Sequence, residues 1–189
     1  MHHANSARSI LAERLLEHHG GSRFHGHSAG SFPRGAVHPL ALALLKEAGL
    51  PTAGLRSKAW DEFAAPGSPA LDFVFTVCDQ AAGEACPAWP GQPITAHWGL
   101  RLPDPAAEQG TDAQRMLAFR EAFQALERRI RLFTSLPMEE TGPHGADPPR
   151  GRDWPRAAGQ RRRDRIVSVT IWHNPACGTS RNTLGPVEI

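Results

Sequence analysis

The sequence predicts an α/β fold in which a parallel β-sheet is flanked by helices. Strand-like and helix-like segments alternate over residues 6–135, and this alternation is typical of a parallel sheet with crossover helices. The segment 71–77 is nearly continuous in apolar and β-branched residues, as expected of a strand that is covered on both faces. The chain of 189 residues is long enough for one such domain and a shorter additional segment.

The first helix of this fold is predicted over residues 6–19. Ile10, Leu11 and Leu15 share one of its sides, and a Gly-Gly pair ends it. The elements that follow in the chain have weaker patterns. They are a strand over 23–29, helices over 37–48 and 58–64, the strand over 71–77 and a strand over 94–98.

A long amphipathic helix is predicted over residues 112–135. Thr111 and Gln114 fit a capping box at its start. Its apolar residues recur at spacings of three and four, which places them on one face. They are Met116, Phe119, Phe123, Leu126, Ile130 and Phe133.

The predicted domain spans residues 1–137, after which the composition changes. Of the 28 residues 138–165, eight are Pro or Gly and seven are Arg, which predicts a disordered linker. Residues 166–172 alternate like a strand, and a loop that opens a helix follows. The segment 166–189 is too short to bury a core of its own.

Composition and charge exclude several classes of protein. The net charge of +2 is too small to indicate binding to nucleic acid. No apolar stretch is long enough to span a membrane, and no secretory signal follows Met1. The sequence therefore predicts a cytoplasmic protein. Three cysteines are too few for a disulfide framework, so they are interpreted as buried, metal-binding or redox-active thiols.

Three groups of residues could carry chemistry. The stretch Asn5–Ser9 stands at a helix start, where free N–H groups and an arginine favour an oxyanion; the alternative is an ordinary helix cap with an exposed Arg8. Cys78 and Cys86 could form an exposed reversible disulfide, or be one core and one incidental cysteine. A zinc site with His97 lacks a fourth ligand, so no metal is predicted. Asp104 stands between two prolines as a general acid or a turn residue.

Together these groups resemble the low-molecular-weight protein tyrosine phosphatase superfamily, and within it the arsenate reductases that are coupled to thioredoxin. The resemblance runs from about residue 5 to residue 137. The stretches that carry it are NSARSILAE, HSAGS, DFVFTVCDQAAGEACPAWPGQP, TAHWGL and PDPA. Two alanines follow the Asp-Pro pair, where phosphatases of the superfamily have tyrosines, and the chain has no tyrosine. This favours arsenate over phosphotyrosine.

The resemblance implies a relay of thiols with no bound cofactor. Arg8 would hold arsenate or phosphate, in a loop formed by Asn5, Ser6, Ala7 and Ser9; Asn5 would brace this loop, and Ser9 would support a thiolate. Cys78 would attack the sulfur that carries arsenic. Cys86 would then close a disulfide with Cys78, which thioredoxin reduces. Asp104 would be the general acid.

The sequence departs from this family at the nucleophile. His2 stands where the resemblance expects the nucleophilic cysteine, and the strand before it is absent apart from Met1. An imidazole cannot take part in thiol exchange. A missing central strand would also expose apolar faces and unpaired strand edges. The fold is therefore expected to lack most of its first strand, and the protein is expected to be impaired or inactive.

The C-terminal stretch has a second resemblance. VTIWHNPACGTSRNTL is similar to the opening of the glutaredoxin-linked arsenate reductases, which use glutaredoxin and glutathione as reductants. In this resemblance Cys177 is the nucleophile. The arginines that bind arsenate in that family would lie beyond Ile189, so the tail alone is expected to be inactive.

Three alternatives to an impaired reductase stay open at this point. In the first, the strand at 166–172 fills the place of the missing strand, and Cys177 comes close to the Arg8 loop. In the second, the protein is a non-catalytic module that binds an oxyanion or thioredoxin. In the third, it is similar to a tyrosine phosphatase.

Overall fold

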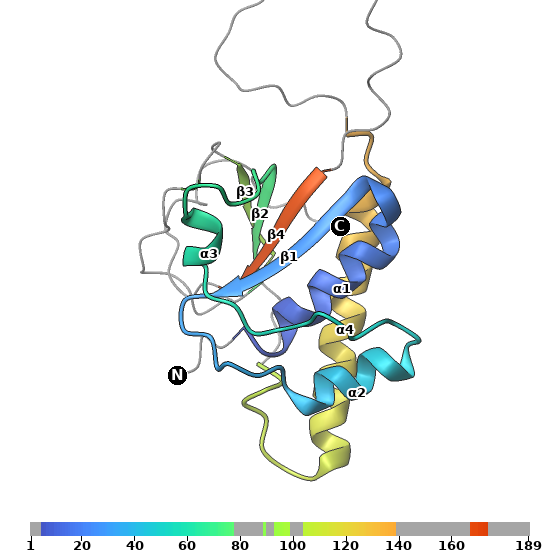
Figure 1. Ribbon diagram of the computed structural model, residues 1–189. Helices are drawn as coiled ribbons and strands as arrows, with labels where there is room; N and C mark the ends of the chain where they lie inside the picture. Colours follow the sequence, from blue (N-terminus) through green and yellow to red (C-terminus); the bar gives the residue numbers. More distant parts are fainter. Residues whose placement is uncertain (1–4, 78–88, 90–92, 99–103, 139–166, 174–189) are drawn as a thin grey trace, which may run out of the picture.

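The computed structural model of the protein describes residues 5–77, 89, 93–98, 104–138 and 167–173. Its centre is a four-stranded sheet with the strand order β1-β4-β2-β3 (Figure 1). Every neighbouring pair of strands is parallel, which confirms the predicted class of fold. The strands are β1 (Phe24–Gly30), β2 (Phe73–Thr76), β3 (Ile94–His97) and β4 (Val167–His173).

The most C-terminal strand of the described chain, β4, lies in the middle of the sheet. It pairs with β1 from Phe24 opposite Val167 to Gly30 opposite His173. On its other side it pairs with β2, with Val169 opposite Phe73. The expectation that β1 and β2 would have unpaired inner edges is therefore wrong, because β4 forms hydrogen bonds to both. The structure thus agrees with the alternative in which the strand at 166–172 takes a central place in the sheet.

Helices cover both faces of the sheet (Figure 1). The helices α1 (Arg8–Gly20) and α4 (Asp112–Ser135) pack on one face, with α2 (Pro39–Glu47) against α4, while the short α3 (Asp61–Ala64) lies on the other face. No helix among these described segments is long and apolar enough to cross a membrane. A short 3-10 turn, η1 (Gly21–Arg23), joins α1 to β1.

Two hydrophobic cores hold the layers together. The larger core joins α1, α2 and α4 to the sheet, and Val169 and Ile171 of β4 are fully buried in it. The smaller core lies on the opposite face, under α3, and consists of Ala29, Phe63, Leu71, Val74 and Trp89. Because side chains alternate along a strand, β4 contributes to both faces of the sheet.

The helix α4 has the predicted bounds and the predicted cap. The backbone N–H of Gln114 donates to Thr111 Oγ1 at 3.3 Å, and the backbone N–H of Thr111 donates to Gln114 Oε1 at 2.9 Å. The other predicted elements are confirmed with ends that shift by at most three residues. Most of the predicted linker and the loop and helix of the tail lie outside the described residues, and the division at 137 and 165 stays a prediction.

Close packing of α1 on β1 depends on Gly26. A Cβ atom at this position would lie 2.7 Å from the backbone carbonyl oxygen of Glu13. Only glycine allows the two backbones to approach so closely. This contact brings Glu13, in the middle of α1, onto β1 within reach of Ser28, which matters for the site below.

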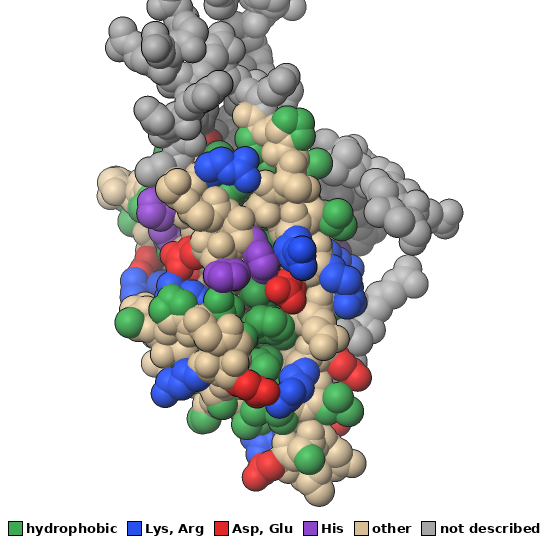
Figure 2. Space-filling model, turned by 90° about the vertical axis from the view of Figure 1, so that its right-hand side faces the viewer, with side chains coloured by type: hydrophobic (Ala, Val, Ile, Leu, Met, Phe, Trp, Pro, Cys, Tyr) green, Lys and Arg blue, Asp and Glu red, His purple; other side chains and the backbone are tan. Residues whose placement is uncertain are grey.

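The outer surface of α1, α2 and α4 is mixed in character. Figure 2 shows acidic, basic and hydrophobic side chains interspersed on this side of the molecule. Leu117 and Leu132 of α4 are more than half exposed. Among the described side chains, this face has no large patch of a single charge, which agrees with the small net charge of the chain.

Candidate functional site

A buried loop, Asn5–Ser9, leads into α1 at the carboxyl edge of the sheet. All five of its residues are at most 4% exposed. The backbone N–H of His38 donates to the carbonyl oxygen of Ser6 at 2.9 Å and ties the loop to the start of α2. Ala7 stands at the N-cap position of α1 and provides no side-chain cap. The first N–H groups and the positive end of the helix dipole are thus directed at a place where an anion can bind.

Asn5 has a strained backbone that its side chain stabilises. Its φ is 36°, in the left-handed region that few residues other than glycine adopt. Its Nδ2 group donates to Ser9 Oγ and to Ser28 Oγ, both at 3.0 Å, and its Oδ1 accepts from the backbone N–H of Lys58 at 2.6 Å. These three hydrogen bonds fix the orientation of the loop against β1 and against the segment before α3.

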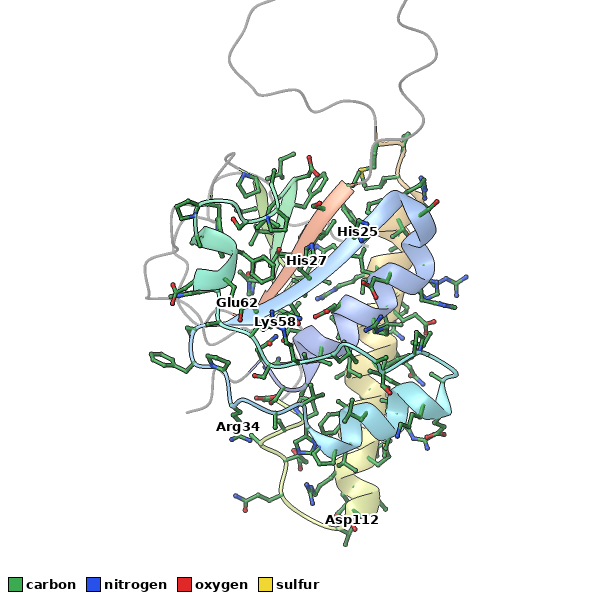
Figure 3. The ribbon with its side chains drawn as sticks, in the orientation of Figure 1. His25, His27, Arg34, Lys58, Glu62 and Asp112 are labelled. Atoms are coloured by element: carbon green, nitrogen blue, oxygen red, sulfur yellow. The ribbon has the colours of Figure 1, made fainter. Side chains whose placement is uncertain are left out.

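A buried ion pair lies next to this asparagine. Lys58 Nζ is 3.0 Å and 3.2 Å from the two carboxylate oxygens of Glu13, and the two side chains are 7% and 8% exposed. Ser28 donates its hydroxyl proton to the same carboxylate. Lys58 lies close to the carboxyl end of β1, as Figure 3 shows. The loop therefore rests on a charged network that the protein excludes from water.

Arg8 and Asp104 face each other at the site. Arg8 Nε lies 3.8 Å from Asp104 Oδ1; the arginine side chain is 3% exposed and the aspartate side chain is 25% exposed. The same carboxylate oxygen accepts from the backbone N–H of Ala106 at 3.2 Å. An arginine guanidinium matches two oxygens of a tetrahedral oxyanion. The partly exposed carboxyl group beside it is suitably placed to exchange a proton with a bound group.

His38 contributes to the electrostatics of this edge. Burial lowers the pKa of His38 below its ordinary value, and the nearby charges of Arg115 and Arg34 lower this pKa further, while Asp104 opposes them. At neutral pH the imidazole is therefore neutral. Its Nδ1 accepts from the backbone N–H of Leu40 and caps α2, so the ring has a structural role there.

The structure brings together six of the predicted site residues: Asn5, Ser6, Ala7, Arg8, Ser9 and Asp104. The three cysteines, Cys78, Cys86 and Cys177, and also His2, lie outside the described residues. Two of these cysteines follow strands of the sheet closely in sequence. Cys78 comes two residues after the end of β2, and Cys177 comes four residues after the end of β4.

Sequence reasoning missed the roles of Glu13, Ser28 and Lys58. Ser28 and Glu13 both belong to stretches that carry the family resemblance, HSAGS and NSARSILAE, but neither stretch indicates what these side chains contact. Glu13 had a detectable signal, because it stands three residues after Ile10 and three before Leu16, on the buried side of α1. A charged residue at such a position needs a buried partner. Nothing near Lys58 in the sequence identified that partner.

No metal site is evident in the part of the chain that the structure describes. Among these residues, no group of three or more His, Cys, Asp or Glu side chains is arranged to hold a metal ion. His97 instead contacts Thr76, with 2.6 Å between Nδ1 and Oγ1. An arginine-bearing loop at a helix start, at the carboxyl edge of a parallel sheet, is the arrangement with which α/β proteins hold an oxyanion.

Comparisons with known proteins agree with this class. Residues 1–141 match the family described as low molecular weight phosphotyrosine protein phosphatase. An arsenate reductase from Halalkalibacterium halodurans is 33% identical over 129 residues, which cover 68% of this chain and 88% of that protein. One from Bacillus subtilis is 30% identical over the same shares of each chain. The protein therefore belongs to the low molecular weight phosphotyrosine protein phosphatase family.

Solved structures show the same fold. A thioredoxin-dependent arsenate reductase from Corynebacterium glutamicum is 28% identical, with a TM-score of 0.50 over 69% of this chain and 55% of that chain. The crystal structure of an arsenate reductase from Archaeoglobus fulgidus has a TM-score of 0.53 over 69% of this chain and 93% of that chain, at 24% identity. Within its family, this chain thus resembles arsenate reductases.

Proposed function

We propose that the protein is an arsenate reductase that works by a relay of thiols, with Cys177 as its nucleophile. The relatives that carry this name and the Arg8 loop support the substrate class. The single observation that carries the choice of nucleophile is the place of β4 in the sheet. The strand that precedes Cys177 is thereby part of the sheet that supports the anion loop, and it is no longer expected to belong to a separate inactive tail.

The geometry of β4 supports this assignment. Its last residue, His173, pairs with Gly30, two residues beyond the Ser28 that contacts Asn5. Cys177 follows four residues later, so covalent geometry limits its Cα to about 14 Å from that of His173. Cys78 follows the end of the neighbouring strand β2 by two residues. The strands that precede the two cysteines thus end at the edge of the sheet at which Arg8 lies.

The proposed reaction proceeds in three thiol steps. The Cys177 thiolate attacks arsenate held by Arg8, and Asp104 protonates the oxygen that leaves as water. The Cys78 thiolate then attacks the sulfur of Cys177; the arsenic–sulfur bond breaks, its electron pair stays on arsenic, and arsenite leaves. Cys86 attacks Cys78 and forms a disulfide with it, which frees Cys177. A dithiol reductant of the thioredoxin class would reduce this disulfide.

The experiment compares arsenate reduction by the native protein and by Cys177→Ser, with thioredoxin, thioredoxin reductase and NADPH. We expect the variant to lose at least about 100-fold in turnover, because the first bond to arsenic cannot form. Cys78→Ser should be equally inactive. Phosphate binding by both variants, measured by calorimetry, should stay at the native level and serves as the control for folding.

Two results would overturn the proposal. Equal turnover by Cys177→Ser and by the native protein would exclude Cys177 as the nucleophile. Phosphate binding without any arsenate reduction by the native protein would favour the non-catalytic oxyanion-binding module.

Hydrolysis of a phosphotyrosine peptide is the third activity to measure. We expect little of it, because the alanines after Asp104 and Pro105 provide no aromatic wall for the ring of such a substrate.

A further inference from the structure

We propose that Lys58 and Glu13 are positioning residues. Their buried ion pair fixes which groups donate and which accept in a closed ring of hydrogen bonds, and this ring holds Asn5 and the anion loop in their binding conformation. This inference rests on the proposed function, because it assigns the loop to oxyanion binding. It adds two residues that do not touch the anion.

The ring can be followed atom by atom. Asn5 Nδ2 donates to Ser28 Oγ at 3.0 Å. The hydroxyl of Ser28 donates to Glu13 Oε2, and this oxygen also lies 3.0 Å from Lys58 Nζ. The backbone N–H of Lys58 returns to Asn5 Oδ1 at 2.6 Å. Lys58 thus contacts the network at both of its ends, once through its side chain and once through its main chain.

The negative charge of Glu13 decides which group donates in the hydrogen bond between Ser28 and Glu13. A serine hydroxyl has one proton, and Ser28 uses it toward the carboxylate, so that its lone pairs are left for the amide group of Asn5. An ionised carboxylate can only accept hydrogen bonds, so the hydroxyl proton of Ser28 points toward Glu13. With 8% of its side chain exposed, Glu13 has little access to water. The ammonium group of Lys58 is the charge that balances it.

The ring acts on the anion loop through Asn5. Left-handed backbone at a non-glycine residue persists only where the surroundings fix it, and Asn5 is fixed by its amide contacts to Ser28, Ser9 and Lys58. Arg8 lies three residues later, at the first position of α1. A change in the conformation of Asn5 would therefore turn the loop relative to the guanidinium group.

The test uses the full-length chain and two readouts that need no turnover. The first is the side-chain amide signal of Asn5 in nitrogen-15 NMR spectra, which the ring protects from exchange with water. The second is the dissociation constant of inorganic phosphate, measured by calorimetry. Lys58→Met should abolish the protection and raise the dissociation constant at least about tenfold, a loss of about 1.4 kcal/mol. Ser28→Ala should do the same while it keeps the ion pair.

A matched control and a rescue separate this role from simple loss of an ion pair. Arg56 and Glu62 form an exposed ion pair, with 2.8 Å between Nη1 and Oε1 and with side chains that are 57% and 41% exposed. Arg56→Met should leave both readouts unchanged. The double variant Lys58→Met/Glu13→Gln should recover part of both readouts. The amide oxygen introduced at residue 13 still accepts from Ser28, and no buried charge is then left unbalanced.

The proposal is overturned if Ser28→Ala or a folded Lys58→Met keeps the native amide signal and the native phosphate affinity. It is also overturned if the double variant binds phosphate no better than Lys58→Met alone. If Lys58→Met does not fold, Ser28→Ala decides. A native protein that binds no phosphate would contradict the proposed function, whereas the amide signal of Asn5 would still test the ring.

Discussion

Thr170 illustrates, at the scale of single residues, how the position of β4 can be tested. Its side chain is fully buried on the face of the sheet opposite Val169 and Ile171. Its Oγ1 atom has no hydrogen-bond partner among the described residues. A buried hydroxyl without a partner is costly, and a methyl group of the same shape would remove that cost.

We therefore expect Thr170→Val to raise the free energy of unfolding by about 1 kcal/mol. Urea unfolding at neutral pH measures this. Thr76→Val is the matched control on the neighbouring strand, because Thr76 Oγ1 contacts His97 Nδ1 at 2.6 Å, and this variant should be less stable than the native protein. A lower stability of Thr170→Val would contradict the buried position of this side chain.

His27, on β1, makes stability depend on pH. Burial lowers the pKa of His27 below its ordinary value of about 6.5; Lys58 and His25 lower this pKa as well, and Glu13 opposes them. Below pH 6.5 the unfolded chain therefore binds more protons at this site than the folded protein does. Stability should fall as the pH decreases from 6.5 to the lowered pKa, and the loss should level off below it.

His27→Gln removes this titration. We expect the variant to lose less stability than the native protein between pH 7 and pH 5, when urea unfolding is measured at both values. A smaller dependence should remain, because the pKa of His38 is also lowered by burial. An identical loss in both proteins would contradict the half-buried environment of the His27 imidazole.

Site residues that lie close together in the chain could be predicted from the sequence, whereas contacts between distant residues could not. Asn5, Arg8 and Ser9 stand close together and gave a local pattern that the family resemblance made specific. Glu13 ends the stretch NSARSILAE that carries the family resemblance, whereas Lys58, 45 residues later, belongs to none of the stretches that carry it. The two residues meet only because α1 packs on β1 and the segment before α3 pairs with Gly30 at the end of β1, so the support of the loop could not be predicted from sequence.

At the scale of elements, β4 behaves as a core strand. Ile171 is fully buried in the larger core. Ile171→Ala should lower the free energy of unfolding by about 3 kcal/mol, through lost burial and the cavity that remains. Ile94→Ala on the edge strand β3 is the matched control, because that side chain is 37% exposed, and it should cost clearly less. Similar effects of the two substitutions would contradict the central place of β4.

The existence of β4 could be predicted, but its neighbours could not be assigned. The alternation of residues 166–172 identified a strand, as the capping box and the apolar spacing identified α4. Its pairing joins Val167 to Phe24 and Val169 to Phe73, across about 140 and 100 residues of chain. Register and order over such separations depend on the whole core, and a local pattern does not contain them.

At the scale of the whole molecule, the order β1-β4-β2-β3 explains how a single chain assembles its site. The loop at Asn5–Ser9 comes from the beginning of the chain, and the strand that leads to Cys177 comes from its end. In parallel sheets, ligands bind at the carboxyl ends of the strands. Figure 1 shows β1 and β4 running side by side toward the same edge. The fold and the proposed relay thus depend on the same strand.

Hydrogen–deuterium exchange at the backbone amides of Val169, Thr170 and Ile171 directly measures whether β4 is hydrogen-bonded inside the sheet. These amides should be protected to the same degree as those of the flanking strands β1 and β2, because β4 forms hydrogen bonds to both. Exchange at the rate of an unstructured peptide, while β1 and β2 stay protected, would contradict the central place of β4.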